Sequence, residues 1–141
     1  MCELFLILFK ISLDFNKKER LGMQQLQFEA SWEKAIAQKD RQEIEQLFQR
    51  TRQKKEEEVQ CVVVRTAINH RQHLLVTALI HNFSQKPLQF NNRELQYAAS
   101  IIKSFHLPSL IIPSQTSMPW TFIFTAGQPF EMDGQLKISL D

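Results

Sequence analysis

The first part of the chain carries apolar residues at helical intervals. Between residues 28 and 58, Trp32 and Ile36 are four positions apart, and a second stripe follows at the i, i+3 and i+4 positions. The second stripe comprises Ile44, Leu47 and Phe48. Side chains at these spacings share one face of an α-helix, so the pattern predicts helices with an apolar face. We expect this face to pack on a sheet formed by the rest of the chain.

Asp40 and Glu43 have the spacing of a capping box. In that motif the N-cap side chain and an acidic side chain three residues later each bind the other's backbone N–H group. The motif predicts that a short first helix ends near Gln38 and that a longer helix begins at Asp40.

From Val59 the apolar pattern takes the period of a strand. The run VQCVVVRTAI is rich in β-branched residues, NHRQH is a polar turn, and LLVTALIHNF alternates apolar with small or polar side chains. We expect the two runs to form an antiparallel hairpin. The second run would place Leu74, Val76, Ala78 and Ile80 on one face and Leu75, Thr77, Leu79 and His81 on the other. Because both faces carry apolar residues, a sandwich is favoured over a single open sheet.

Short apolar runs separated by Pro, Asn and Gly fill the remainder of the chain. Pro87, in the turn SQKP, would interrupt a central strand. The further predicted strands are LQF, RELQYAAS, IIKSFHLP, SLIIP, PWTFIFTA and, after a turn at Asp133-Gly134, GQLKISL. This spacing predicts a mainly β fold, a small antiparallel immunoglobulin-like β-sandwich with an N-terminal helical element. The helical segment would span residues 23–58 and pack on the sheet, and the sandwich would span residues 59–141.

Residues 1–22 contain an apolar run, Leu4 to Phe9, that differs from a secretion signal. Glu3 stands where a signal is positive, the basic residues follow the run, and no small-residue cleavage site follows. The run is also shorter than the roughly 20 residues that cross a bilayer. Purine-only codons for residues 17–20 would resemble a ribosome-binding site, so we expect residues 1–22 to be a disordered leader or untranslated, with translation starting at Met23. An N-terminal peptide that contains Cys2 would contradict the later start.

Composition and charge narrow the class of protein. A chain of 141 residues with 43% hydrophobic and 23% charged residues fits one globular domain. Seventeen basic and 15 acidic residues give a net charge of +2 with no strong clustering, so we expect no nucleic-acid partner. The two cysteines, Cys2 and Cys61, cannot form a disulfide framework, which indicates a reducing compartment.

Candidate metal ligands and nucleophiles are sparse. His70 and His73 form an H-x-x-H pair, but the pair falls in a predicted turn without further ligands at metal-binding spacing. His81 is expected to face a pocket or to be a hydrogen-bonded structural residue. Ser114 and Ser117 lack the G-x-S-x-G pattern of a nucleophile elbow.

Cys61 has no histidine nearby in the sequence, and three glycines make no phosphate-binding loop. We therefore expect a protein that is not an enzyme and that has no cofactor and no metal site. A metal-binding or hydrolytic protein that uses His70, His73 and His81 is the alternative.

The stretch PSQTSMPWTFIF combines a polar turn with an aromatic strand. Trp120, Phe122 and Phe124 alternate with other residues, so they point to one face and can fill the core of a sandwich. Trp120 also follows Met118-Pro119 beside a turn, where a tryptophan is a frequent anchor for a protein partner. Both interpretations can hold for different residues of the strand.

Two blocks of the sequence carry a family resemblance. Their marking residues are Val76-Thr77-Ala78, Asn82, Lys86-Pro87 and Phe90 in LLVTALIHNFSQKPLQF, and Pro113, Ser117, Pro119-Trp120-Thr121-Phe122 and Phe124 in LIIPSQTSMPWTFIF. They resemble the SLAP domain, which occurs in bacterial surface-layer (S-layer) assembly proteins of the accessory Sec system and in smaller proteins of spore-forming Gram-positive bacteria. The resemblance extends from Trp32 to about Phe124.

The resemblance implies a non-enzymatic protein-interaction domain associated with S-layer protein export or assembly. Its expected partner is a protein, either of the export machinery or an S-layer precursor, with no stable membrane insertion. The candidate partner-binding residues are Trp120, Met118, Pro119, Pro87, Leu88 and Phe90. An exposed sheet edge from Pro87 to Phe90 would accept an extended segment by strand addition.

The lack of an export signal leads us to expect a cytoplasmic protein, with a peripheral membrane position as the alternative. A small cytoplasmic protein of unrelated role that reuses the fold is the alternative to a role in export.

Overall fold

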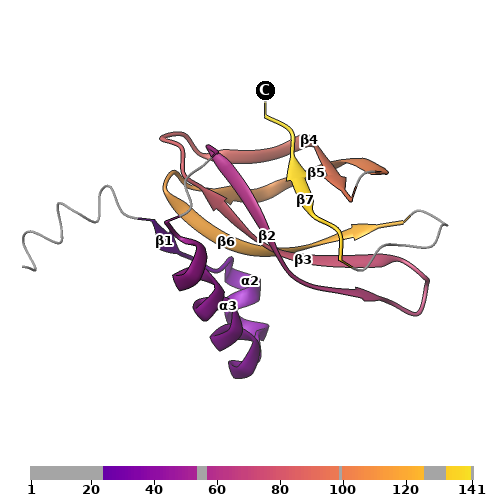
Figure 1. The fold of residues 1–141 in the computed structure, drawn as a ribbon, viewed down its shortest axis with the longest axis horizontal. Helices are drawn as coiled ribbons and strands as arrows, with labels where there is room; N and C mark the ends of the chain where they lie inside the picture. The colour runs from indigo at the N-terminus through magenta and orange to yellow at the C-terminus, as the bar shows by residue number, and fades with distance from the viewer. Residues whose placement is uncertain (1–23, 54–56, 99, 126–132, 141) are drawn as a thin grey trace, which may run out of the picture.

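The computed structural model describes residues 24–53, 57–98, 100–125 and 133–140. Residues 1–22, the expected leader, lie outside this part of the chain. The elements are β1 (Gln25–Leu26), α2 (Ala30–Ala35), α3 (Gln38–Thr51), β2 (Val59–Ile68), β3 (Leu74–Asn82), β4 (Leu88–Tyr97), β5 (Ile101–Ile112), β6 (Thr116–Phe124) and β7 (Leu136–Ile138). Figure 1 shows three layers, in which the helices lie against one sheet and the second sheet covers the opposite face of the first.

The sheet next to the helices, sheet A, has the strand order β1-β6-β3-β2. β3 pairs antiparallel with β2 and β6, and the short β1 pairs parallel with the start of β6. The turn between β2 and β3 is held by the side chain of Asn69. Its Oδ1 accepts the backbone N–H groups of Arg71 at 2.9 Å and His73 at 3.0 Å. This side chain closes the hairpin that the sequence pattern predicts.

The second sheet, sheet B, has the antiparallel order β5-β4-β7. The sequence predicts LQF and RELQYAAS as separate strands, and likewise IIKSFHLP and SLIIP, but each pair forms one continuous strand. Bulges make this possible: the partner of β4 jumps from Ile111 at Gln89 to Leu107 at Phe90, which leaves Pro108 outside the ladder. Proline needs no ladder hydrogen bond there, so it does not end β5.

The main core lies between the two sheets. Leu74, Val76, Ala78 and Ile80 of β3 face this core, together with aromatic side chains from both sheets. On the opposite face of β3, Leu79 packs with Ile44 and Phe48 of α3. Both faces of β3 are therefore covered, as its alternating pattern indicates. The prediction of a mainly β sandwich with an N-terminal helical element is confirmed.

The helix boundary differs from the prediction. The chain leaves the helical conformation at Ile36 and Ala37, and α3 begins at Gln38, two residues before Asp40. The predicted capping box is wrong, because Ala37 occupies the N-cap position and no side chain caps this end. Asp40 lies in the first turn of α3 and Glu43 in the second, and both bind Arg65 of β2 instead. The sequence spacing is the same for both roles, and only the tertiary position of Arg65 distinguishes them.

The uncapped start of α3 allows a stabilising substitution. We expect Ala37→Ser to raise the free energy of unfolding by about 1 kcal/mol, because its hydroxyl would accept an unpaired N–H group of the first turn. The backbone of Ala37 already has the extended conformation of an N-cap residue, with φ −71° and ψ 149°. Urea denaturation of both proteins measures the difference, and Ala35→Ser, inside α2, is the control that should not stabilise.

Candidate functional site

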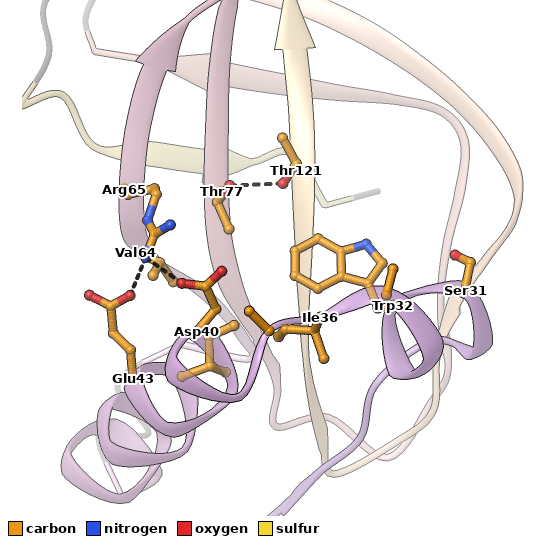
Figure 2. A pocket seen from close by; sticks show the side chains of 12 residues that line it. Ser31, Trp32, Ile36, Asp40, Glu43, Val64, Arg65, Thr77 and Thr121 are labelled. Carbon is orange, nitrogen blue, oxygen red and sulfur yellow. Dashed lines mark hydrogen bonds and ion pairs between the residues drawn. The ribbon is translucent and has the colours of Figure 1, made fainter.

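A cleft of about 590 Å³ lies where the helices meet sheet A. It is bounded by α2, the start of α3, and the helix-facing residues of β2, β3 and β6 (Figure 2). Thr77 of β3 and Thr121 of β6 occupy opposite positions in the ladder, and their hydroxyl oxygens are 2.8 Å apart. Val64 of β2 lines the same floor. The floor thus combines hydroxyl groups with an aliphatic side chain.

The wall of the cleft is apolar and comes from α2 and the break that follows it. Trp32 of α2 and Ile36 of the break project toward the sheet (Figure 2). The Trp32 ring stacks on Trp120 of β6, with centroids 6.4 Å apart and planes inclined by 27°. Trp120 also packs against the core between the sheets, so this aromatic pair joins the helical layer to the sandwich. The stack fixes the position of the wall.

Charged side chains form the rim of the cleft. Arg65 Nη2 lies 3.2 Å from Asp40 Oδ1 and also donates to Glu43 Oε1. These hydrogen bonds, first that to Glu43 and then that to Asp40, raise the pKa of the Arg65 guanidinium. Two carboxylates face one guanidinium, so the rim keeps a formal charge of −1. Because all three side chains are about half exposed, the ion pairs can exchange partners at little energetic cost.

A chain of buried polar side chains connects the end of α3 to β3 and β6, outside the cleft. Thr51 Oγ1 donates to the Leu47 carbonyl, so it accepts from His81 Nε2 at 2.8 Å. The other ring nitrogen, Nδ1, then accepts the hydroxyl proton of Ser117, and Ser117 Oγ accepts from Gln24 Nε2 at 3.0 Å. This arrangement requires a neutral imidazole, and burial lowers the pKa of His81 to about 4.

Asn82 organises the turns at the same end of the sandwich. Its Nδ2 donates to the carbonyl groups of Lys86 (2.8 Å), Ile112 (3.0 Å) and Pro113 (3.1 Å). Its Oδ1 accepts from the backbone and the hydroxyl of Ser84. One side chain therefore ties β3 to the connection before β4 and to the turn between β5 and β6.

The candidate partner-binding residues have different environments. Met118, Leu88 and Phe90 are at most 5% exposed in the core, and Pro119 is also buried. Pro87 is exposed and Trp120 is partly exposed. Of this set, Pro87 and Trp120 therefore have the side chains that can contact a partner without rearrangement of the core.

The edge from Pro87 to Phe90 is partly blocked. β5 pairs with one side of β4, and on this segment Arg93 Nε donates to the Gln89 carbonyl at 3.0 Å. Asn92 has a positive φ of 58° at the adjacent bulge, which bends the strand. These features disfavour the addition of a strand here.

The histidines of the metal-binding alternative are not brought together. His70 and His73 lie in the β2–β3 turn, whereas His81 lies near the far end of β3, about 25 Å away by strand rise. Within the described ranges, no group of three or more His, Cys, Asp or Glu side chains is arranged to hold a metal ion.

The structure does join Ser117 to His81, two residues that no local motif connects. Both side chains are 0% exposed, so the pair has no contact with solvent in this conformation. Ser114 lies in the turn before β6. Burial raises the pKa of the Cys61 thiol, which disfavours its nucleophilic thiolate form.

The chain matches a known family of protein domains. The family model described as the SLAP domain matches residues 26–137. The chain belongs to the SLAP domain family. No curated protein and no solved structure matches the chain.

The marking residues of this SLAP domain serve mainly its fold. Asn82 and Ser117 belong to the buried polar network, and Phe122 and Phe124 fill the core between the sheets. The cleft draws on residues that the sequence analysis did not select as a site, namely Asp40, Glu43, Arg65, Thr77 and Thr121. In the described part of the SLAP domain, no helix has the length and apolarity needed to cross a bilayer.

Proposed function

We propose that this SLAP domain is a non-enzymatic protein-interaction module and that its helix–sheet cleft holds a segment of a protein partner. The observation that carries the proposal is the composition of the cleft, which has an apolar wall, a floor with hydroxyl groups and an acidic rim. A buried anchor surrounded by polar contacts is the usual anatomy of a protein-binding surface. A partner segment with an apolar anchor and a neighbouring basic residue matches these groups, because Asp40 and Glu43 outnumber Arg65 at the rim.

We further propose that the partner takes part in the export or assembly of S-layer proteins and that the domain works in the cytoplasm. Membership of the SLAP domain family supports the first part. The free thiol of Cys61 supports the second. A cytoplasmic role unrelated to export, with the same fold, is the competing proposal.

Obstruction of the cleft should abolish partner capture while the fold remains intact. We expect Thr121→Arg to reduce the recovered partner at least about tenfold, because a long cation would extend from the floor into the cleft and repel a basic residue. The measurement is crosslinked affinity purification from the native host, with the protein tagged at its C-terminus and partners quantified by mass spectrometry. Recovery of the secretion ATPase or an S-layer precursor would support the export role.

Thr125→Arg is the matched control, because Thr125 is exposed and lies outside the cleft. It introduces the same charge and should leave capture unchanged. Equal capture by wild type and Thr121→Arg, with both proteins folded by circular dichroism, would show that the cleft is not the binding site. If capture of the partner depends on the cleft but the partner has no link to export, the proposal of a protein-interaction module stands and the proposal of an S-layer role fails.

A further inference from the structure

The free strand edges of the sandwich differ in how they are protected. On the outer side of β6, the Ser117 carbonyl accepts from the backbone N–H of Gln27, which follows β1. The Ile123 carbonyl accepts from Lys103 Nζ at 3.1 Å. Backbone groups alternate sides along a strand, so Pro119 and Thr121 also face outward on this edge. Pro119 has no N–H group to offer there. This edge is therefore interrupted at several successive positions.

The edges of sheet B carry similar interruptions. β4 lies between β5 and the short β7, which pairs only with Leu95–Tyr97. The part of β4 that β7 does not pair has two bulges, and Arg93 donates to the backbone carbonyls of Gln89 and Ser139. β5 contains Lys103 and Pro108 along its length. Lysine, proline and bulges are the usual devices that prevent a strand edge from pairing with another chain.

β2 forms the opposite edge of sheet A and lacks these devices over its first half. Residues Val59 to Val63 read VQCVV and contain no charge, proline or glycine. Phe83 N donates to the Glu58 carbonyl, so the backbone groups of Glu58 face β3. Because these groups alternate along the strand, the N–H and C=O groups of Val59, Cys61 and Val63 point away from β3. Within the described residues no strand pairs with this outer side.

An open groove runs along this edge. β2 and β7 border it and lie side by side in Figure 1, and its volume is about 410 Å³. Gln60, which lines the groove, has a buried Oε1 without a hydrogen-bond partner in the described part of the chain. The groove therefore combines unpaired backbone groups with an unpaired side-chain acceptor beside apolar residues.

We propose that the β2 edge pairs antiparallel with β2 of a second copy of this chain, with Cys61 on the two-fold axis. In this register Val59 lies opposite Val63 of the second copy, and Cys61 lies opposite Cys61. Each of these residues turns its N–H and C=O groups outward, so the two edges match without a shift. The pairing makes about six backbone hydrogen bonds and joins the two A sheets into one.

A second copy fits this edge because the strand is self-complementary. The side chains brought together are uncharged, and valine pairs across antiparallel strands are favourable. This interface is separate from the cleft, which lies on the helix-facing side of sheet A.

Sedimentation equilibrium and oxidative crosslinking of the full chain test the interface. We expect a dimer at about 100 μM and a monomer for Val62→Lys, because a lysine on the paired segment places two cations close together across the two-fold axis. Ala67→Lys is the control, since Ala67 is exposed on the same strand outside the paired segment. In a Cys2→Ser background, copper-catalysed oxidation should give a disulfide-linked dimer that Cys61→Ser abolishes, because Cα atoms about 5.5 Å apart permit this bond.

A wild-type protein that stays monomeric and gives no Cys61 crosslink would overturn the interface. A dimer that persists in Val62→Lys would also overturn it, because another surface would then hold the copies together. Thermal unfolding of each variant shows whether the loss of the dimer reflects loss of the fold, and a folded monomeric Val62→Lys beside a dimeric Ala67→Lys is the supporting result.

Discussion

Asn82→Asp is expected to lower the free energy of unfolding by about 3–5 kcal/mol at pH 7. The wild-type amide is 0% exposed and donates to three backbone carbonyl groups. Aspartate has the same shape, but it places a carboxylate oxygen where the amide donated. The variant loses these hydrogen bonds and buries a negative charge among carbonyl oxygens, and both changes are costly. Urea denaturation followed by tryptophan fluorescence measures the loss.

Asn91→Asp is the matched control for this prediction. Asn91 is exposed on β4, and its side chain has one weak hydrogen bond, to Gln89 at 3.3 Å. The same chemical change there should alter the free energy of unfolding by less than about 0.5 kcal/mol. If both variants lost equal stability, the role assigned to Asn82 in joining the turns would be wrong.

The pH dependence of stability should carry a large contribution from His81. Its pKa falls from 6.5 in the unfolded chain to about 4 in the folded protein, because burial penalises the charged ring. Between these values the unfolded state binds a proton that the folded state does not. The contribution of His81 to the free energy of unfolding is therefore present above pH 6.5. It is lost as the pH drops toward 4, by about 3 kcal/mol in total.

His81→Gln separates this contribution from that of other groups. The variant should be less stable than wild type at pH 7, but its stability should change less between pH 6.5 and pH 4. His106→Gln, at an exposed position of β5, should retain the wild-type slope. Urea denaturation across this pH range gives the slopes, and the same slope for wild type and His81→Gln would contradict a neutral buried imidazole.

The sequence predicts those parts of the fold that depend on the period of one segment. The alternation from Leu74 to His81 identifies both covered faces of β3, and the helical stripe of Ile44 and Phe48 identifies the surface that meets it. The bulge at Phe90 that accommodates Pro108 is not predictable in this way, because it depends on the register of two strands. The role of Asp40 likewise depends on Arg65, which lies 25 positions along the chain.

The candidate site is less accessible to sequence analysis than the fold. The alternation of Trp120, Phe122 and Phe124 predicts that these side chains share one face of the strand, and they do pack on the core. It does not show that Met118 and Pro119 are buried, because that depends on the layers packed against β6. The cleft combines side chains from two helices and three strands that share no motif, so only the folded chain brings them together.

Site-specific photo-crosslinking in the native host shows directly whether a protein partner occupies the cleft. A photoreactive residue at Ile36 lies in the wall of the cleft, and the same residue at Ile102, which is 58% exposed on sheet B, is the control. We expect a protein partner to be crosslinked at Ile36 and not at Ile102, and we expect Thr121→Arg to remove this product. A partner crosslinked only at Ile102, or a product at Ile36 that Thr121→Arg leaves unchanged, would contradict the assignment of the cleft as the binding site.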